Sequence, residues 1–142
     1  MTRTAQFRWF EALDRATDKI VFAICLREGD LHIGNASLDS IDYRHRNARF
    51  SIFLADPAHR RRGIGTHAMN LVLEYAFNYI NLYRVYAKSD AEREHIMNFY
   101  RKLGFQVEGR MREHEYVNGR FLDKHLVAIL RSEWLAQTQG RE

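Results

Sequence analysis

Apolar residues recur along this 142-residue chain with two different periods, which predict a mixed α/β architecture. Spacings of three and four residues predict helices at 8–16, 63–79 and 91–103. Short runs rich in β-branched and aromatic residues predict strands at 20–26, 31–38, 48–55, 82–87, 105–116 and 121–130. The succession of strand, long helix and strand over residues 48–87 indicates a right-handed crossover, and therefore one parallel pair inside a mostly antiparallel sheet.

Turn residues stand where the predicted elements end. Gly29 and the pair Asn118-Gly119 predict tight turns between consecutive strands, and Gly104 predicts a left-handed cap after the last helix. The chain has one proline, Pro57, and no repeat or low-complexity stretch. We therefore expect a single domain over residues 1–142.

The composition is that of a globular protein. Hydrophobic residues make up 46% of the chain and charged residues 28%, and no uncharged apolar run approaches the roughly 18 residues of a membrane helix. The charged first residues lack the apolar centre of a secretory signal, which favours a cytoplasmic location away from membranes. The single cysteine, Cys25, lies in the apolar run 20–26, so we expect it to be buried rather than to act as a nucleophile.

A basic loop, His59 to Thr66, connects the third predicted strand to the long helix. Its glycines allow a ligand to approach the backbone closely, and the free amides and dipole of a helix N-terminus favour negative charge. The formal net charge of +4 also favours an anionic partner, which composition leaves open between nucleic acid and a phosphorylated cofactor. Because the order of glycines fits neither a Walker loop nor a dinucleotide fingerprint, we interpret the loop as a pyrophosphate site of another kind.

Three segments resemble the GNAT acyltransferase superfamily. The loop Arg60-x-x-Gly63-x-Gly65 is similar to the Arg/Gln-x-x-Gly-x-Gly/Ala signature by which these enzymes bind the pyrophosphate of acetyl-coenzyme A. The stretch 98–105 is similar to the Tyr, Lys, Gly, Phe motif that closes a later helix of the superfamily. Residues 115–123, followed by Trp134, resemble the C-terminal hairpin of the branch that acetylates ribosomal protein amino termini and polyamines. The resemblance covers about residues 8 to 135.

The resemblance implies an α/β (α+β) fold of the GNAT type, a mixed and mostly antiparallel sheet flanked by helices, whose central parallel strands splay apart. It implies acetyl-coenzyme A as co-substrate, held by main chain at one strand, by the loop, and by Lys102 unless that side chain is a plain surface lysine. The implied cofactor-binding residues are Phe53, Leu54, Ala55, Arg60, Arg61, Arg62, Gly63, Ile64, Gly65, Thr66 and Lys102. Tyr100 would be catalytic, as the donor of a proton to the departing thiolate. The seven histidines show neither zinc-type spacing nor partner cysteines, so we expect no metal.

The chain departs from the superfamily pattern at three places. The stretch 47–51 contains no carboxylate where many members carry a glutamate base, and Arg93 replaces an asparagine that contacts pantetheine in many members. A water chain, an acceptor that arrives deprotonated, or one of five side chains could replace the base: Asp39, Asp42, Glu113, His114 and Glu115. The chain also begins too late to include most of the usual first strand and helix, and the resulting exposed sheet edge favours a homodimer.

We expect an acetyl-coenzyme A dependent N-acetyltransferase whose acceptor, a primary amine, attacks the thioester directly. A protein amino terminus, an amino sugar, another small amine or a polyamine would qualify, and Arg110 and Arg112 make a polyamine the least favoured. Two alternatives stay open: an acyl-coenzyme A binding sensor or partner subunit without activity, and a nucleic-acid-binding protein that uses the arginines at 44–49 and 60–62. No helix-turn-helix, zinc or RNA-recognition signature supports nucleic-acid binding.

Overall fold

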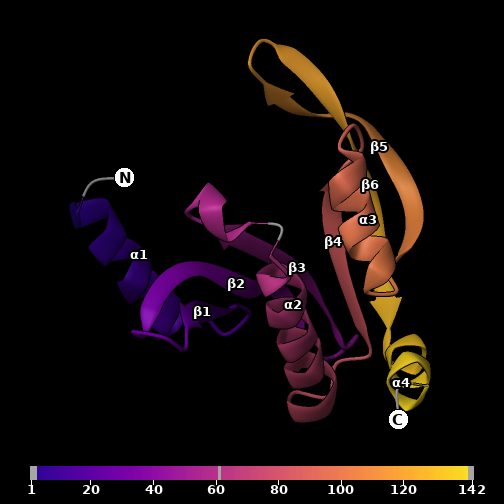
Figure 1. Cartoon of the computed structure of the whole chain (residues 1–142), viewed down its shortest axis with the longest axis horizontal. Helices are drawn as coiled ribbons and strands as arrows, with labels where there is room; N and C mark the ends of the chain where they lie inside the picture. The colour runs from indigo at the N-terminus through magenta and orange to yellow at the C-terminus, as the bar shows by residue number, and fades with distance from the viewer. Residues whose placement is uncertain (1–2, 61, 141–142) are drawn as a thin grey trace.

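The computed structural model describes residues 3–60 and 62–140, which form a six-stranded sheet accompanied by helices (Figure 1). The strands are β1 (Ile20–Leu26), β2 (Leu31–Asp42), β3 (Asn47–Leu54), β4 (Arg84–Asp90), β5 (Gln106–Val117) and β6 (Arg120–Leu130). Their order is β1-β2-β3-β4-β6-β5, and all neighbours pair antiparallel except β3 and β4. The predicted crossover with its single parallel pair is confirmed.

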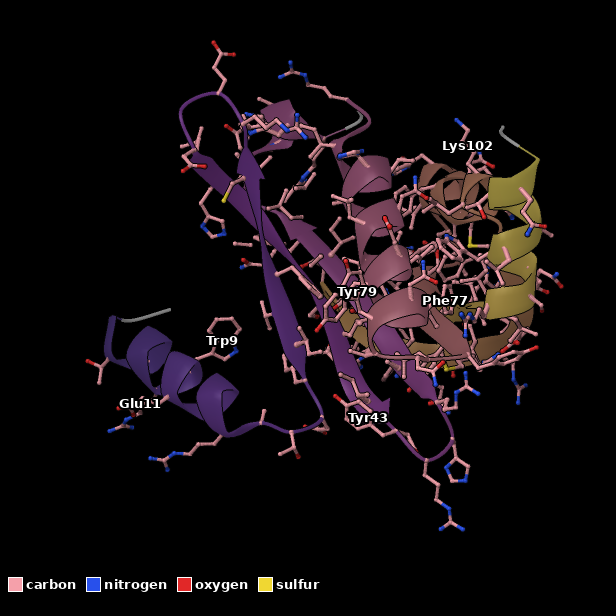
Figure 2. All side chains as sticks on the ribbon, turned by 90° about the horizontal axis from the view of Figure 1, so that it is seen from below. Trp9, Glu11, Tyr43, Phe77, Tyr79 and Lys102 are labelled. Carbon is pink, nitrogen blue, oxygen red and sulfur yellow. The ribbon has the colours of Figure 1, made fainter. Side chains whose placement is uncertain are left out.

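Helices lie on both sides of the strands. They are α1 (Arg3–Arg15), α2 (Ile64–Glu74), α3 (Glu94–Lys102) and α4 (Arg131–Gln139), with a short 3₁₀ turn η1 (Pro57–His59) and a π-helical turn η2 (Tyr75–Tyr79) that continues α2. Figure 2 shows α1 on one side of β1, β2 and β3, and α2 and α4 on the other side. Trp9 points from α1 toward the strands (Figure 2).

The parallel pair is short, and its shortness divides the sheet. Residues 47–49 of β3 pair with residues 84–86 of β4, and the two strands then separate. By contrast, β3 stays paired with β2 as far as Leu54, and β4 stays paired with β6 as far as Asp90. The sheet therefore has a first arm (β1, β2 and β3) and a second arm (β4, β6 and β5), which are joined at one end and open at the other (Figure 1).

The core lies between the sheet and the helices α2, α3 and α4. Leu38 and Phe50 of the first arm, Val85 of the second arm and Phe77 of η2 are each at most 2% exposed. Trp134 of α4 packs on Phe77 with ring centroids 5.4 Å apart. Because alternate residues of each strand enter this core, the side chains between them lie on the opposite face of the sheet.

Several element boundaries differ from the sequence predictions. Strand β2 continues to Asp42 through an irregularity in its pairing with β3, and β4 is shifted to 84–90. Helix α3 begins at Glu94, because the Asp90 side chain accepts a hydrogen bond from the amide of Glu92 and holds a turn there. Helix α1 begins as early as Arg3. Helix α4 was not predicted, since its apolar residues follow no clear helical stripe.

The turn predictions are confirmed and the cysteine prediction is wrong. Asn118 and Gly119 both have positive φ, 49° and 82°, as a two-residue hairpin turn of this type requires, and Gly104 has φ 88°. Cys25 is exposed. It follows Ile24, which is 9% exposed and enters the core, so the alternation of the edge strand β1 turns the thiol outward. No helix in the described part of the chain is long and apolar enough to span a membrane.

Candidate functional site

A groove of about 1050 Å³ lies where the two arms separate, between the end of β3, the start of α2 and the face of α3. It is lined by Ile52, Phe53, Leu54, Arg60, Gly63, Gly65, Thr66, Arg93, His95, Ile96, Asn98, Phe99, Tyr100 and Lys102. The first arm and the loop after it supply one wall, and α3 supplies the other. The groove therefore exists only because β3 and β4 stop pairing after three residues each.

The N-terminus of α2 forms the end of the groove at which amides are available. Gly63 caps the helix in the left-handed conformation with φ 81°, which glycine adopts without the steric cost of a Cβ atom. The first helical hydrogen bond runs from the His67 amide to the Gly63 carbonyl, so the amides of Ile64, Gly65 and Thr66 have no acceptor within the helix. Together with the helix dipole, these amides favour an anion.

Two further contacts shape this end of the groove. The Arg60 guanidinium donates to the Leu54 carbonyl over 3.1 Å, which ties the loop to the end of β3. A Cβ atom on Gly65 would lie 3.6 Å from the Phe99 ring and 3.9 Å from Ile52. Any longer side chain at Gly65 would therefore extend between the two walls and fill the groove.

The main chain of β3 can serve a ligand at alternate residues only. The Ala55 amide donates to the Ile33 carbonyl over 2.9 Å, so it is already engaged with the partner strand β2. In an antiparallel ladder successive residues direct their amide and carbonyl to opposite sides, so Phe53 also faces β2 and Leu54 faces the gap. Of the three residues predicted to offer main-chain groups, Leu54 is the one directed into the groove.

Tyr100 stands on the α3 wall. Its side chain is 6% exposed and lies edge-on between the rings of Phe99 and Phe105, with centroids 5.1 and 5.2 Å away. Burial raises the pKa of Tyr100 to about 12. The phenol is therefore protonated at neutral pH and available as a hydrogen-bond or proton donor.

The charged side chains that line the groove, Arg60, Arg93 and Lys102, are all basic, and the imidazole of His95 lies among them. Asp90 lies close by and pairs with Arg93, with 3.2 Å between its Oδ2 and the guanidinium Nε. Lys102 projects into solvent from the end of α3 (Figure 2). The groove is thus suited to a ligand that is anionic over part of its length. Among the residues that the structure describes, no three His, Cys, Asp or Glu side chains come together as a metal site would require.

The structure brings most of the predicted residues to this groove. Eight of them line it: Phe53, Leu54, Arg60, Gly63, Gly65, Thr66, Tyr100 and Lys102. Ala55, Arg62 and Ile64 are close in sequence but do not line it, and Arg61 lies outside the described residues. The sequence predictions missed Ile52, His95, Ile96, Asn98 and Phe99. The spacing of Ile96, Phe99 and Tyr100 along one face of α3 was the signal that could have identified the second wall.

The five candidate bases have very different surroundings. Asp39 is buried and paired with Lys19, Asp42 is bonded to His45, and Glu115 is paired with Lys124. Glu113 is exposed in a strand irregularity, where its amide donates to Asp123. The His114 Nε2 lies 3.1 Å from the Lys88 Nζ. None of the five is among the residues that line the groove.

Comparisons with known proteins agree with this geometry. Residues 1–106 match the family model of the acetyltransferase (GNAT) domain. The chain is 35% identical over 104 residues to spermidine N(1)-acetyltransferase of Escherichia coli K12, and 34% identical over 107 residues to that of Vibrio cholerae; the matches cover 73% and 75% of this chain. They cover 55% and 61% of those proteins, so the chain spans little more than half the length of the curated relatives it matches.

A solved structure shows that the likeness extends to the fold. The chain superimposes with a TM-score of 0.89 and 27% identity on a Vibrio cholerae spermidine N-acetyltransferase in complex with CoA and spermine, covering 95% of this chain and 79% of that one. The predicted fold class is thereby confirmed, with its mostly antiparallel sheet and its separating parallel pair. The chain belongs to the GNAT acetyltransferase family.

Proposed function

We propose that this chain transfers an acetyl group from acetyl-coenzyme A to a primary amine. The observation that carries the proposal is the groove between the separating strands, with amides that have no acceptor inside the helix at one end and a buried, protonated phenol on the opposite wall. Relatives that bear the name of an N-acetyltransferase, and one solved with CoA, support the same donor.

The residues present fit a coenzyme A molecule. The amides of Ile64, Gly65 and Thr66, together with Arg60, would hold the pyrophosphate, and Lys102 would neutralise a further phosphate. The bare Gly65 leaves room for the chain of the cofactor between Ile52 and Phe99. Leu54 would offer its amide to that chain from the edge of β3.

Acetyl-coenzyme A, when bound, supplies a thioester whose carbonyl an amine can attack. Tyr100 holds a proton in the apolar wall and would donate it to the sulfur as the carbon–sulfur bond breaks, and the proton that the nitrogen releases on forming the amide would restore the phenol. A second catalytic side chain is not needed on β3 if the amine reaches the site as the neutral base. The proposed acceptor class is a primary amine; the names of the relatives are a reason to test spermidine and spermine beside protein amino termini and amino sugars.

The first test is calorimetric titration of the chain with acetyl-coenzyme A, followed by thiol release with a panel of amines. Tyr100→Phe should lower kcat by about 100-fold, because the proton donor is lost. It should leave cofactor affinity unchanged, because the ring packing remains. Lys124→Met, which removes a charge of β6 paired with Glu115, serves as the control.

Each outcome separates the three hypotheses. Binding with amine-dependent thiol release that falls in Tyr100→Phe supports the transferase. Binding without thiol release for any amine would contradict it and favour an acyl-coenzyme A binding protein, an alternative that the missing carboxylate at 47–51 motivates. Absence of cofactor binding together with salt-sensitive binding of duplex DNA would favour the nucleic-acid hypothesis.

A further inference from the structure

The acceptor of the proposed transferase has to meet the thioester on the face of the sheet opposite α2 and α3, because the groove and the core occupy the helix side. The residues of that opposite face follow from the strand register. Asp39 of β2, Arg49 of β3 and Tyr86 of β4 are paired positions and share one face. Lys88 lies two residues beyond Tyr86 on that face, where β4 has left β3.

Cations outnumber carboxylates at the point where the strands part. Lys19 Nζ lies 3.0 Å from the Asp39 Oδ1, and the Arg49 Nη2 lies 3.6 Å from the Asp39 Oδ2, so two cations share one buried carboxylate. The second distance is longer than a good hydrogen bond. The Nε of Arg49 is buried and has no hydrogen-bond partner among the described residues. The buried Nε is out of reach of a ligand, but the Arg49 side chain is 41% exposed, so its terminal amino groups remain available as donors.

Lys88 is the matching cation on the second arm. Its Nζ contacts the Nε2 of His114 at 3.1 Å, and no carboxylate of the described residues pairs with it. The contact requires His114 to accept the hydrogen bond and so to be neutral while Lys88 is charged. The charge of Lys88 is therefore exposed at the edge of the gap.

Three acidic groups of the second arm are each neutralised by a base of their own, whereas Glu113, which is exposed beside His114, has no ion pair among the described residues. Glu108 bonds to Arg84 through both oxygens, Glu115 pairs with Lys124, and Asp90 pairs with Arg93. A polycation would have to break these three pairs to use their carboxylates. An anion, by contrast, can reach the exposed terminal amino groups of Arg49 and the exposed ammonium of Lys88.

We propose that Arg49 and Lys88 form the acceptor-selecting site of this protein, and that its preferred acceptor is a primary amine that also carries a carboxylate, not a polyamine. This inference rests on the proposed transferase function. The acceptor proposed for this chain differs in charge from spermidine, the amine in the names of the relatives, because spermidine has cationic groups only.

The same two cations, Arg49 and Lys88, would also make a carboxylate base at 47–51 unnecessary. An ammonium group placed beside Arg49 and Lys88 is disfavoured by like charge, so the pKa of the acceptor amine falls. The carboxylate of the acceptor would bind the two cations, while the amine beside it loses its proton to water before attack. The same two charges thus select the acceptor and favour the loss of a proton from its amine.

The test compares three acceptors of matched length: 4-aminobutyrate, butylamine and 1,4-diaminobutane. Thiol release from acetyl-coenzyme A is measured for each, and kcat/KM should fall in that order, by about tenfold at each step. A higher kcat/KM for 1,4-diaminobutane than for butylamine would overturn the inference and leave the transferase function standing. Thiol release with another amine of the panel but with none of these three would overturn this inference and leave the transferase function standing, whereas cofactor binding without thiol release for any amine would overturn both.

Substitutions test whether Lys88 and Arg49 determine the preference for the acceptor. Lys88→Met changes an exposed side chain and should lower the ratio of kcat/KM for 4-aminobutyrate over 1,4-diaminobutane by about tenfold, with cofactor affinity unchanged. Arg49→Met should do the same, and Lys19 remains to pair with Asp39 so that folding is retained. Arg44→Met, an exposed arginine in the turn between β2 and β3, is the control and should leave the ratio unchanged. An unchanged ratio in both Lys88→Met and Arg49→Met would overturn the assignment.

Discussion

The two arms of the sheet are held together by different means. The first arm contains a partly buried polar cluster, in which the Ser37 and Ser51 hydroxyls both donate to Asp39 over 3.0 and 3.1 Å, and a close backbone approach at Gly34. The second arm is apolar where it faces the core, and its buried Ser89 hydroxyl has no partner among the described residues. The first arm is thus fixed by specific contacts, and the second by packing.

The difference matters because each arm supplies one wall of the groove. The β3 wall and the loop after it have to present amides at defined positions, which requires a fixed backbone. The α3 wall presents a ring and aliphatic groups, for which ordinary core packing is sufficient. Changes to the first arm should therefore be felt more strongly than equivalent changes to the second arm.

The largest expected effect is that of Gly34→Ala in the first arm. The added Cβ would lie 2.2 Å from the Phe53 carbonyl oxygen, a backbone atom, so β2 and β3 must move apart. We expect a loss of about 3 kcal/mol and a fall in Tm of about 10 °C. Thermal unfolding followed by circular dichroism measures it.

The matched control for this change is in the second arm. A Cβ on Gly109 of β5 meets nothing within 4 Å, so Gly109→Ala should change the stability by less than about 0.5 kcal/mol. Equal losses in the two variants would show that the arms do not differ in this way.

The sequence predicted the arms better than the space between them. Periodicity located the strands and the glycine loop, and the resemblance predicted a splayed pair, because these depend on local pattern and on one motif. Which main-chain groups face the gap depends on pairing register, so Leu54 could not be separated from Phe53 and Ala55 before β2 was placed.

The same limit applies to the second wall and to the acceptor face. Phe99 and His95 belong to the groove because α3 packs across the gap from Gly65, a relation between segments far apart in the chain. The shared carboxylate of Lys19 and Arg49 joins three strands or their ends. The prediction that Cys25 is buried was wrong for a simpler reason, because an apolar run on an edge strand buries only one of its two faces.

A second prediction concerns the groove between the arms. Gly65→Leu should lower the affinity for acetyl-coenzyme A by about 100-fold, because the side chain would fill the space between Ile52 and Phe99. Gly65→Ala is the control, since its Cβ makes ordinary contacts at 3.6 and 3.9 Å and should change the affinity by less than about threefold. Equal calorimetric dissociation constants for the two variants would argue against the cofactor lying there.

A third prediction tests the polar cluster of the first arm through pH. Burial alone would raise the pKa of Asp39, but hydrogen bonds from Lys19, Ser37 and Ser51 outweigh it, and the pKa lies below the ordinary 3.8. A depressed pKa gives stability that is complete above the unfolded pKa and is lost as the pH falls through the folded pKa. Asp39→Asn should therefore cost about 2 kcal/mol at pH 7.

The pH series decides whether the charge is responsible. The difference in unfolding free energy between the wild type and Asp39→Asn should shrink below about pH 4, where the Asp39 carboxyl of the unfolded chain begins to take up its proton while that of the native protein, with its lower pKa, does not. Denaturant titrations at several pH values measure this difference. A difference that stays constant down to pH 2 would show that shape, and not charge, makes Asp39 important.

The smallest expected effect has the opposite sign and lies in the second arm. Ser89 is 1% exposed and its hydroxyl has no hydrogen-bond partner among the described residues. Removing this hydroxyl from water on folding therefore costs free energy that no hydrogen bond in the native state offsets. Ser89→Ala should raise the unfolding free energy by about 1 kcal/mol, whereas Ser37→Ala, which removes hydrogen bonds to Asp39 and Ser51, should lower it. Denaturant titration compares the two variants directly. Destabilisation by both would mean that the second arm also depends on a specific polar contact, and the contrast between the arms would fail.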